Sequence, residues 1–230
     1  MCGVVILLLA WCNKSITKFA ATFNMEAISQ HDNQNRYIGH PPLIVQLRPV
    51  LDLTDDQLYE FCQINRDLRI ERNRQGELII MPPTGGETSE RNAEIIIQLG
   101  SWAKRNGEGA TFDSSGGFRL NNGAVRSPDA AWVKYSRLNT LTAEERQKFL
   151  PLCPEFVIEL RSPTDSQDVL REKMQEYIDN GAHLAWLIDL ELKHVYVYRP
   201  GETAQELEQP EKISGEPLLS GFELDLREIW

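Results

Sequence analysis

Three charged residues stand where a charge is costly or where chemistry would need one. Asp129 follows Pro128 directly, at the entrance of an apolar segment. Glu159 interrupts the apolar run at 156–160, and Lys173 lies in the helical stretch that comes next. Because an unpaired carboxylate inside a buried strand costs several kcal/mol, Glu159 must find a cation or hydrogen-bond donors.

These residue types suit the hydrolysis of a phosphodiester. That reaction needs a cation at the phosphate, a deprotonated water and neutralisation of the developing charge. Two carboxylates on adjacent strands form a hard oxygen site for Mg²⁺ or Mn²⁺, and the backbone carbonyl of Leu160 would add a ligand. Lys173 would orient the attacking water and offset charge in the transition state.

The elements that position these residues are predicted from apolar periodicity and turn signals. Thr54 and Thr142 suit the N-caps of helices, and Asn180-Gly181 suits a C-cap. Asn121-Asn122-Gly123 is a strong turn signal. The expected helices are 54–65, 87–105, 142–149 and 166–180, and the expected strands are 68–73, 77–81, 118–120, 125–135, 156–160, 184–190 and 194–199.

This order of elements predicts an α/β (α+β) domain with a central mixed β-sheet flanked by helices. The domain is expected to span residues 51–230. The strand at 194–199 would form an exposed edge, so a homodimer stays an open alternative that no residue decides.

Residues 1–50 are expected to be an N-terminal extension that is disordered or a mis-assigned start. The apolar run from Val4 to Trp11 has 8 residues, whereas a membrane-spanning helix needs about 20, so no membrane span is expected. A secretory signal would carry basic residues ahead of this run, and none precedes it. We hypothesise that translation starts at Met25.

The net charge of −10 argues against a protein that simply coats nucleic acid. Acid is concentrated in residues 174–230, with 4 basic and 12 acidic residues, while residues 119–173 carry 9 basic and 8 acidic residues. The stretch that holds the candidate site therefore permits a phosphodiester substrate. The 4 cysteines are scattered without a CxxC pair, which favours reduced thiols and a cytoplasmic location over a zinc site or a disulfide framework.

Four segments carry a resemblance to a known family, namely SPDAAWV (127–133), PEFVIELRSP (154–163), KMQEYIDNGAHLAWLID (173–189) and LLSGFELDLREIW (218–230). In this order and spacing the chain resembles the PD-(D/E)XK nuclease superfamily and, within it, the Uma-two family of restriction-endonuclease-like proteins. The resemblance runs from about residue 51 to residue 230. It implies a restriction-endonuclease-like core, dependence on a divalent metal and DNA as the substrate.

Carried over by position, the resemblance implies that Asp129 is the PD acid and Glu159 the (D/E) acid, both holding metal. The superfamily pattern expects lysine where this chain has Arg161. The Uma-two pattern resembles one in which that lysine has moved to the next helix, which indicates Lys173. Superfamily members often carry a further acid on the first core helix. Glu94 fits that position, with Glu87 and Glu90 as rivals.

Simpler interpretations stand beside these. Asp129 alone would serve as a turn residue after Pro128, and Lys173 alone as a solvated helix lysine. Glu159 would be explained by a structural ion pair with Arg161 or Arg119. The leading hypothesis is a Mg²⁺-dependent endodeoxyribonuclease. The alternatives are a catalytically inactive nuclease-fold module for binding or regulation, which the acidic balance and Arg161 favour, and a metal-assisted hydrolase with another substrate.

Overall fold

The computed structural model describes residues 7–8, 19–20 and 41–230. The chain divides into two units, residues 1–37 and 38–230. Within the first unit, β1 (Leu7–Leu8) pairs antiparallel with β2 (Phe19–Ala20). Met25 lies outside the described residues, so the hypothesis about the start of translation stays a prediction. Among the described residues, no helix has both the length and the apolar character needed to cross a bilayer.

A mixed six-stranded sheet forms the centre of the second unit, as expected. Its strand order is β13-β12-β11-β10-β9-β6. Only β10 and β11 run parallel within it, joined by helix α4, while the other neighbouring pairs are antiparallel. The strands are β6 (Gly109–Asp113), β9 (Ala130–Lys134), β10 (Phe156–Arg161), β11 (Leu184–Asp189), β12 (His194–Tyr198) and β13 (Gln205–Glu208), and α4 is Gln167–Asp179.

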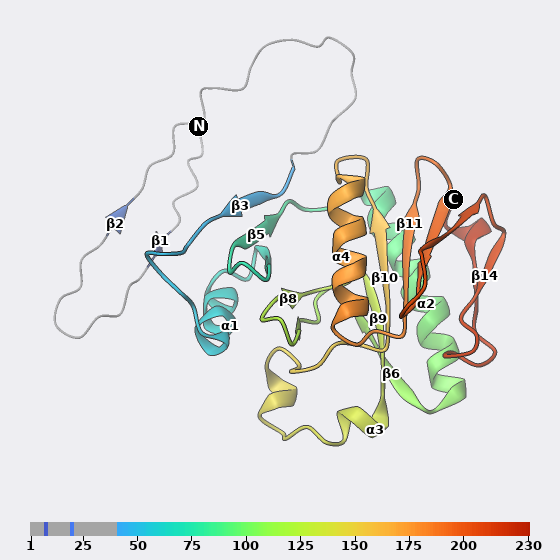
Figure 1. Cartoon of the computed structure of the whole chain (residues 1–230), viewed down its shortest axis with the longest axis horizontal. Helices are drawn as coiled ribbons and strands as arrows, with labels where there is room; N and C mark the ends of the chain where they lie inside the picture. The colour runs from blue at the N-terminus through green and yellow to red at the C-terminus, as the bar shows by residue number, and fades with distance from the viewer. Residues whose placement is uncertain (1–6, 9–18, 21–40) are drawn as a thin grey trace, which may run out of the picture. The chain divides into compact units, whose positions relative to one another are not determined.

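Helices cover both faces of this sheet (Figure 1). Successive side chains of a strand point to opposite faces, so Val157 of β10 packs in the cluster that holds Met174 of α4, while Ile158 packs in the cluster that holds Ile95 of α2 (Gly86–Asn106). The C-terminal elements β14 (Lys212–Ser214), β15 (Glu223–Asp225) and η2 (Leu226–Glu228) add Leu224 and Leu226 to the α2 side. The sheet is therefore buried on both sides.

A second, five-stranded sheet lies beside α1 (Asp55–Ile64) and has the order β3-β5-β4-β8-β7. Its core contains Leu58, Ile70 and Val125. Because β3 pairs with β5, the folded unit extends beyond the predicted boundary at residue 51 toward the N-terminus. The strands are β3 (Leu43–Val45), β4 (Arg69–Arg72), β5 (Leu78–Met81), β7 (Phe118–Arg119) and β8 (Val125–Arg126).

The strand expected over 125–135 proves to be two strands that belong to different sheets. β8 ends at Arg126 in the second sheet, and β9 begins at Ala130 in the central sheet. The link contains Pro128, which has no N–H to donate to a ladder and fixes its own φ. The chain therefore leaves the second sheet at Arg126 and enters the central sheet at Ala130, directly after Asp129. Beyond β9, the short helix α3 (Tyr135–Leu138) follows directly.

The helix expected over 142–149 is also wrong, since only η1 (Glu145–Gln147) forms there. The predicted capping box is present, because Thr142 N donates to Glu145 Oε2 at 2.8 Å and Glu145 N to Thr142 Oγ1 at 3.2 Å. However, Leu150 exchanges backbone hydrogen bonds with Gly117 and Arg119 at 2.9 and 2.8 Å. These bonds require extended chain, so tertiary pairing overrides the local helix signal.

The strand expected at the sheet edge, 194–199, is not an edge. β12 is paired on both sides, with β11 and with β13. The structural argument for a homodimer through that edge is therefore removed, and the homodimer itself stays a prediction.

Candidate active site

The register of two neighbouring strands brings Asp129 and Glu159 together. β9 and β10 pair antiparallel with Ala130 opposite Ile158, so one step further along places Asp129 opposite Glu159 on the same face of the sheet. The backbone N–H of Leu160 donates to Asp129 Oδ2 at 2.9 Å, which holds that carboxylate against β10. Both acids are buried, with 7% of Asp129 and 4% of Glu159 exposed.

Lys173 supplies the cation that Glu159 was expected to need. Its Nζ lies 2.8 Å from Glu159 Oε1. One helical turn later on α4, the hydroxyl of Tyr177 donates to the same oxygen at 2.9 Å. The carboxylate is therefore bound by two side chains of the helix that packs over its face of the sheet.

The alternative partners of Glu159 are engaged elsewhere. Arg161 lies 2.7 Å from Asp189 Oδ2 and 3.3 Å from Glu191 Oε2. Arg119 pairs with Asp55 at 3.3 Å. The arginine at the third motif position thus stabilises the end of β11, and the interpretation of Glu159 as its partner is wrong.

Glu71 of β4 is the buried acid that sequence reasoning missed. Its Oε1 accepts hydrogen bonds from Lys173 Nζ and from the backbone N–H of Ser127, both at 2.9 Å. Its Oε2 lies 3.1 Å from Arg126, which also donates to Glu176 Oε2 of α4 at 2.6 Å. Three of the four residues of β4 are charged, which is typical of a solvated hairpin strand, but contacts with Lys173, Arg126 and Ser127 bury Glu71.

Two further side chains contact Asp129. Arg69 Nη2 donates to Asp129 Oδ1 at 3.3 Å and to the carbonyl of Ser127 at 2.8 Å. Asn92 Nδ2 of α2 donates to the same Asp129 oxygen at 3.3 Å. Neither residue was singled out from the sequence, because neither a surface arginine in a hairpin nor an asparagine in a helix is unusual alone.

Glu94 is not brought into this cluster. Its Oε1 accepts from Gln98 Nε2 at 3.0 Å, and Gln98 in turn contacts the backbone of Asp225. Two residues along an α-helix rotate a side chain by about 200°, so Glu94 and Asn92 point to different sides of α2. Of the rivals, Glu87 pairs with Arg91 at 3.3 Å and Glu90 is exposed.

The buried acids differ in how well their charge is supported. Burial raises the pKa of Glu159 to about 7; Lys173 opposes this, but the charges of Asp129 and Glu71 add to it. For Glu71, burial also acts to raise the pKa, yet Lys173, Arg126 and the Ser127 amide outweigh it and bring the pKa to about 2. Glu159 is therefore the carboxylate whose anionic form the protein stabilises less.

The donor set fits a hard divalent cation that shares its coordination with water and substrate. Within the described ranges no group of three or more His, Cys, Asp or Glu side chains is arranged to hold a metal. Mg²⁺, however, is commonly bound through one or two carboxylates together with waters and substrate phosphates. Asp129 and Glu159 supply two carboxylates, and the buried Asn92 Oδ1 beside them has no hydrogen-bond partner among the described residues.

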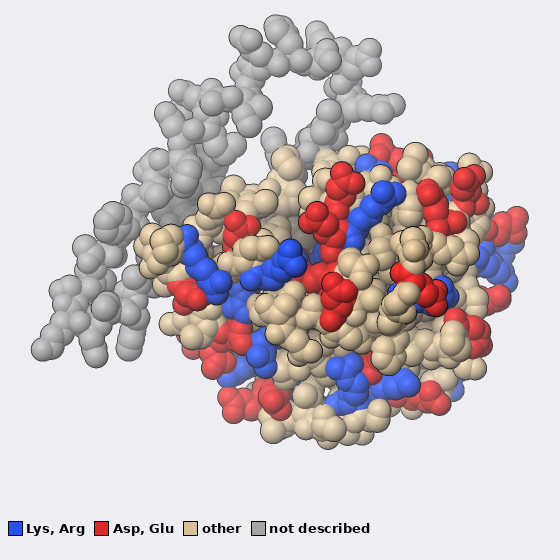
Figure 2. Space-filling model, viewed as in Figure 1, with Lys and Arg blue, Asp and Glu red and all other residues tan. Residues whose placement is uncertain are grey.

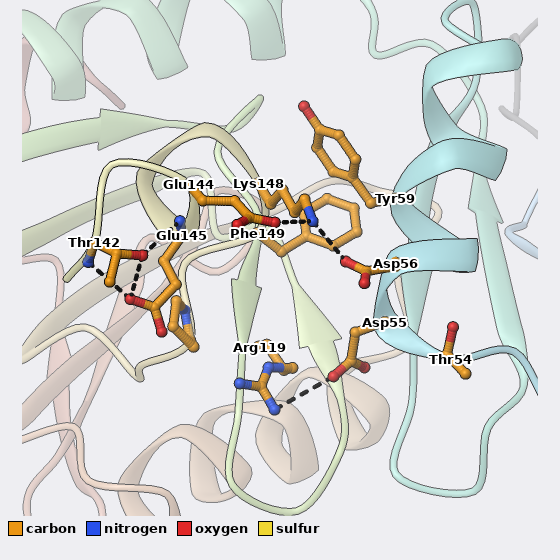
Figure 3. A pocket seen from close by; sticks show the side chains of 11 residues that line it. Thr54, Asp55, Asp56, Tyr59, Arg119, Thr142, Glu144, Glu145, Lys148 and Phe149 are labelled. Carbon is orange, nitrogen blue, oxygen red and sulfur yellow. Dashed lines mark hydrogen bonds and ion pairs between the residues drawn. The ribbon is translucent and has the colours of Figure 1, made fainter.

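A separate cavity of about 550 Å³ lies between α1 and the segment 142–151 (Figure 3). None of the predicted site residues lines it. We call it the α1 pocket. Its lining residues are Thr54, Asp55, Asp56, Tyr59, Arg119, Thr142, Glu144, Glu145, Lys148, Phe149 and Pro151.

A mixed sheet with a helix on each face, two acids on adjacent strands and a lysine from the connecting helix define a nuclease-like α/β fold. Residues 55–227 match the model of the Uma2 family, described as "putative restriction endonuclease". The chain therefore belongs to the Uma2 family, which confirms the resemblance seen in its motifs.

A solved structure confirms the fold. The chain is similar to a putative nuclease belonging to DUF820 from Anabaena variabilis ATCC 29413, with a TM-score of 0.60 and 22% identity. The similarity covers 70% of this chain and 88% of that chain. No curated protein matches the chain.

Proposed function

We propose that this protein is a Mg²⁺-dependent endodeoxyribonuclease that hydrolyses phosphodiester bonds in DNA. The observation that carries the proposal is the grouping of Asp129, Glu159 and Lys173. Asp129 faces Glu159 across the β9–β10 pair, and Lys173 Nζ lies 2.8 Å from Glu159 Oε1. Family membership supports a nuclease; the metal is our inference from the donor set, and DNA is our inference from the family's description as a putative restriction endonuclease.

Each side chain has a role that follows from its contacts. Asp129 and Glu159, with the carbonyl of Leu160, would hold the cation. When bound, a divalent cation supplies Lewis-acid stabilisation of phosphoryl oxygens and lowers the pKa of a coordinated water. An ammonium group has three donors, of which Lys173 uses two on Glu71 and Glu159. The third can reach the attacking water or the phosphate, while Tyr177 fixes the orientation of Glu159.

The face seen in Figure 2 gives DNA binding no broad support from charge. The face in Figure 2 has acidic and basic side chains side by side instead of one continuous basic area. With a net charge of −10 over the chain, affinity for DNA is expected to be modest and to depend on a few local groups near the acids.

Cleavage assays on several substrates test the proposal. Purified protein would be incubated with supercoiled plasmid, single-stranded DNA, RNA and a small phosphodiester, each with Mg²⁺, Mn²⁺ or EDTA. We expect nicking or linearisation of plasmid that EDTA abolishes, and a loss of about 100-fold or more in Asp129→Asn. Equal cleavage by the variant, or cleavage that survives EDTA, would contradict the assignment.

Calorimetry separates this enzyme from an inactive nuclease-fold module, which the structural pairing of Arg161 with Asp189 favours. If the protein is a metal-dependent nuclease, it should bind Mn²⁺, and Asp129→Asn should weaken its affinity for Mn²⁺ at least about tenfold. A module that has kept only the fold should show no Mn²⁺ binding that depends on Asp129.

A further inference from the structure

Three cations touch the buried acids, and Arg69 differs from the other two. Lys173 and Arg126 each lie between two carboxylates, and their side chains are 10% and 9% exposed. The Arg69 side chain is 27% exposed and, among the described residues, pairs with only one carboxylate, at 3.3 Å. Arg69 is therefore the cation of this cluster that is most exposed to an incoming anion.

The hydrogen bonds of Arg69 leave part of its guanidinium unused. Nη2 serves both the Ser127 carbonyl and Asp129 Oδ1. Nε is buried and has no partner within the described part of the chain. Guanidinium presents five N–H donors in a planar fork that matches two oxygens of a phosphate. A buried donor without a partner is costly, and a ligand oxygen at Nε would supply the missing partner.

The position of Arg69 on β4 gives that ligand a location. The side chain approaches Asp129 from the second sheet, whereas Lys173 approaches Glu159 from α4. A phosphodiester placed at the two acids would thus have a cation on each side. Of these two cations, Arg69 is the one that pairs with a single carboxylate and has an unpaired Nε among the described residues.

We propose that Arg69 binds a non-bridging oxygen of the substrate phosphodiester and so positions it at Asp129 and Glu159. This inference rests on the proposed function, since it names the group that binds the backbone of the nucleic acid. A purely structural role is the competing explanation, because Arg69 also holds the Ser127 carbonyl beside Asp129. The two roles differ in their effects on substrate binding.

Substitutions of Arg69 and of Arg48 form a matched test. Arg48 also donates to one backbone carbonyl, that of Gln75, and to one carboxylate, that of Asp52, but away from the acids of the site. Arg69→Gln, Arg69→Lys and Arg48→Gln would be compared in the full chain. The readouts are kcat and KM with Mg²⁺, Kd for a DNA duplex in Ca²⁺ at several salt concentrations, and melting temperature.

If Arg69 binds phosphate, Arg69→Gln should raise KM and Kd about tenfold and reduce the slope of log Kd against log salt by about 1. Arg69→Lys should recover part of the affinity, and Arg48→Gln should match the wild type. An unchanged slope and KM in Arg69→Gln, even with a lower kcat or melting temperature, would overturn the inference. So would a wild-type protein that binds no duplex.

The two proposals fail in distinguishable ways. Duplex binding in Ca²⁺ does not require cleavage. A wild-type protein that binds DNA through Arg69 but cuts nothing would refute the nuclease and retain the phosphate contact. Cleavage that depends on Asp129 but not on Arg69 would retain the nuclease and refute the phosphate contact.

Discussion

Lys173 and Lys148 make nearly the same contacts in different surroundings. Lys173 Nζ lies 2.9 Å from Glu71 and 2.8 Å from Glu159. Lys148 Nζ, in the α1 pocket, lies 3.0 Å from Asp56 and 2.9 Å from Glu144 (Figure 3). In both cases one ammonium group bridges two carboxylates that belong to separate segments of the chain.

Lys173 and Lys148 differ in how deeply their acidic partners are buried. The side chains of the acids around Lys173 are 2% and 5% exposed, whereas the side chains of those around Lys148 are 72% and 78% exposed. Water screens the charges in the α1 pocket, so its ion pairs contribute little and shift with salt. At Lys173 the charges are desolvated and bind one another strongly, and the pKa of Glu159 moves to about 7. If the proposed function holds, the same contacts form a reactive site only where solvent is excluded.

Activity should differ most between the two regions. Glu159→Gln removes a carboxylate from the proposed metal site, so we expect cleavage of plasmid to fall by about 1000-fold or more. Glu144→Gln removes the corresponding acid beside Lys148 and should leave the rate within about twofold. Rates of plasmid cleavage at saturating Mg²⁺ measure both. A large loss in Glu144→Gln would place the chemistry in the α1 pocket instead.

The second largest difference between the two regions is expected in how substitution of their lysines changes the stability of the fold. Lys173→Met leaves Glu71 and Glu159 buried without the cation between them, and we expect a loss of about 3 to 5 kcal/mol in the free energy of unfolding. Lys148→Met leaves two solvated carboxylates and should hardly move the urea midpoint. Urea denaturation in EDTA compares them. Equal, small effects of both substitutions would mean that water already reaches Lys173.

The pH dependence of stability gives the smallest effect. Glu159 has a pKa of about 7 when folded, raised from the ordinary 4.5, so its contribution is present below about pH 4.5 and is lost as pH rises to about 7. In EDTA, the wild type should therefore lose stability over this range relative to Glu159→Gln. Glu71, with its pKa lowered to about 2, acts in the opposite sense below about pH 4.5. Parallel pH profiles for wild type and Glu159→Gln would contradict the asymmetry between these acids.

Much of this site could be predicted from local sequence. An acid inside an apolar strand is conspicuous, and a helix that follows the strand must return over the sheet, so Glu159 and Lys173 were expected to meet and do. The bounds of α1, α2 and α4 lie close to those expected from caps and periodicity, as at Thr54, whose side chain accepts from Gln57 N, whereas the helix expected over 142–149 did not form.

What could not be predicted depends on how separate segments dock. Glu71, Arg69 and Arg126 reach the acids from the second sheet, and their strands carry no signal that both faces become buried. Asn92, and not Glu94, faces Asp129 because the rotation of α2 is set by its packing. Sequence periodicity identifies the apolar side of a helix but not the polar residue that meets a given strand end.

Ser127, in the link between the two sheets, is held to β4 through its own backbone, since its N–H donates to Glu71 and its carbonyl accepts from Arg69. Moving β4 away from the central sheet and α4 must break the hydrogen bonds from Arg69 to Asp129 and from Lys173 to Glu71. A partly opened molecule would therefore lose contacts of both acids at once. Local unfolding of this segment would abolish the proposed activity before the core unfolds.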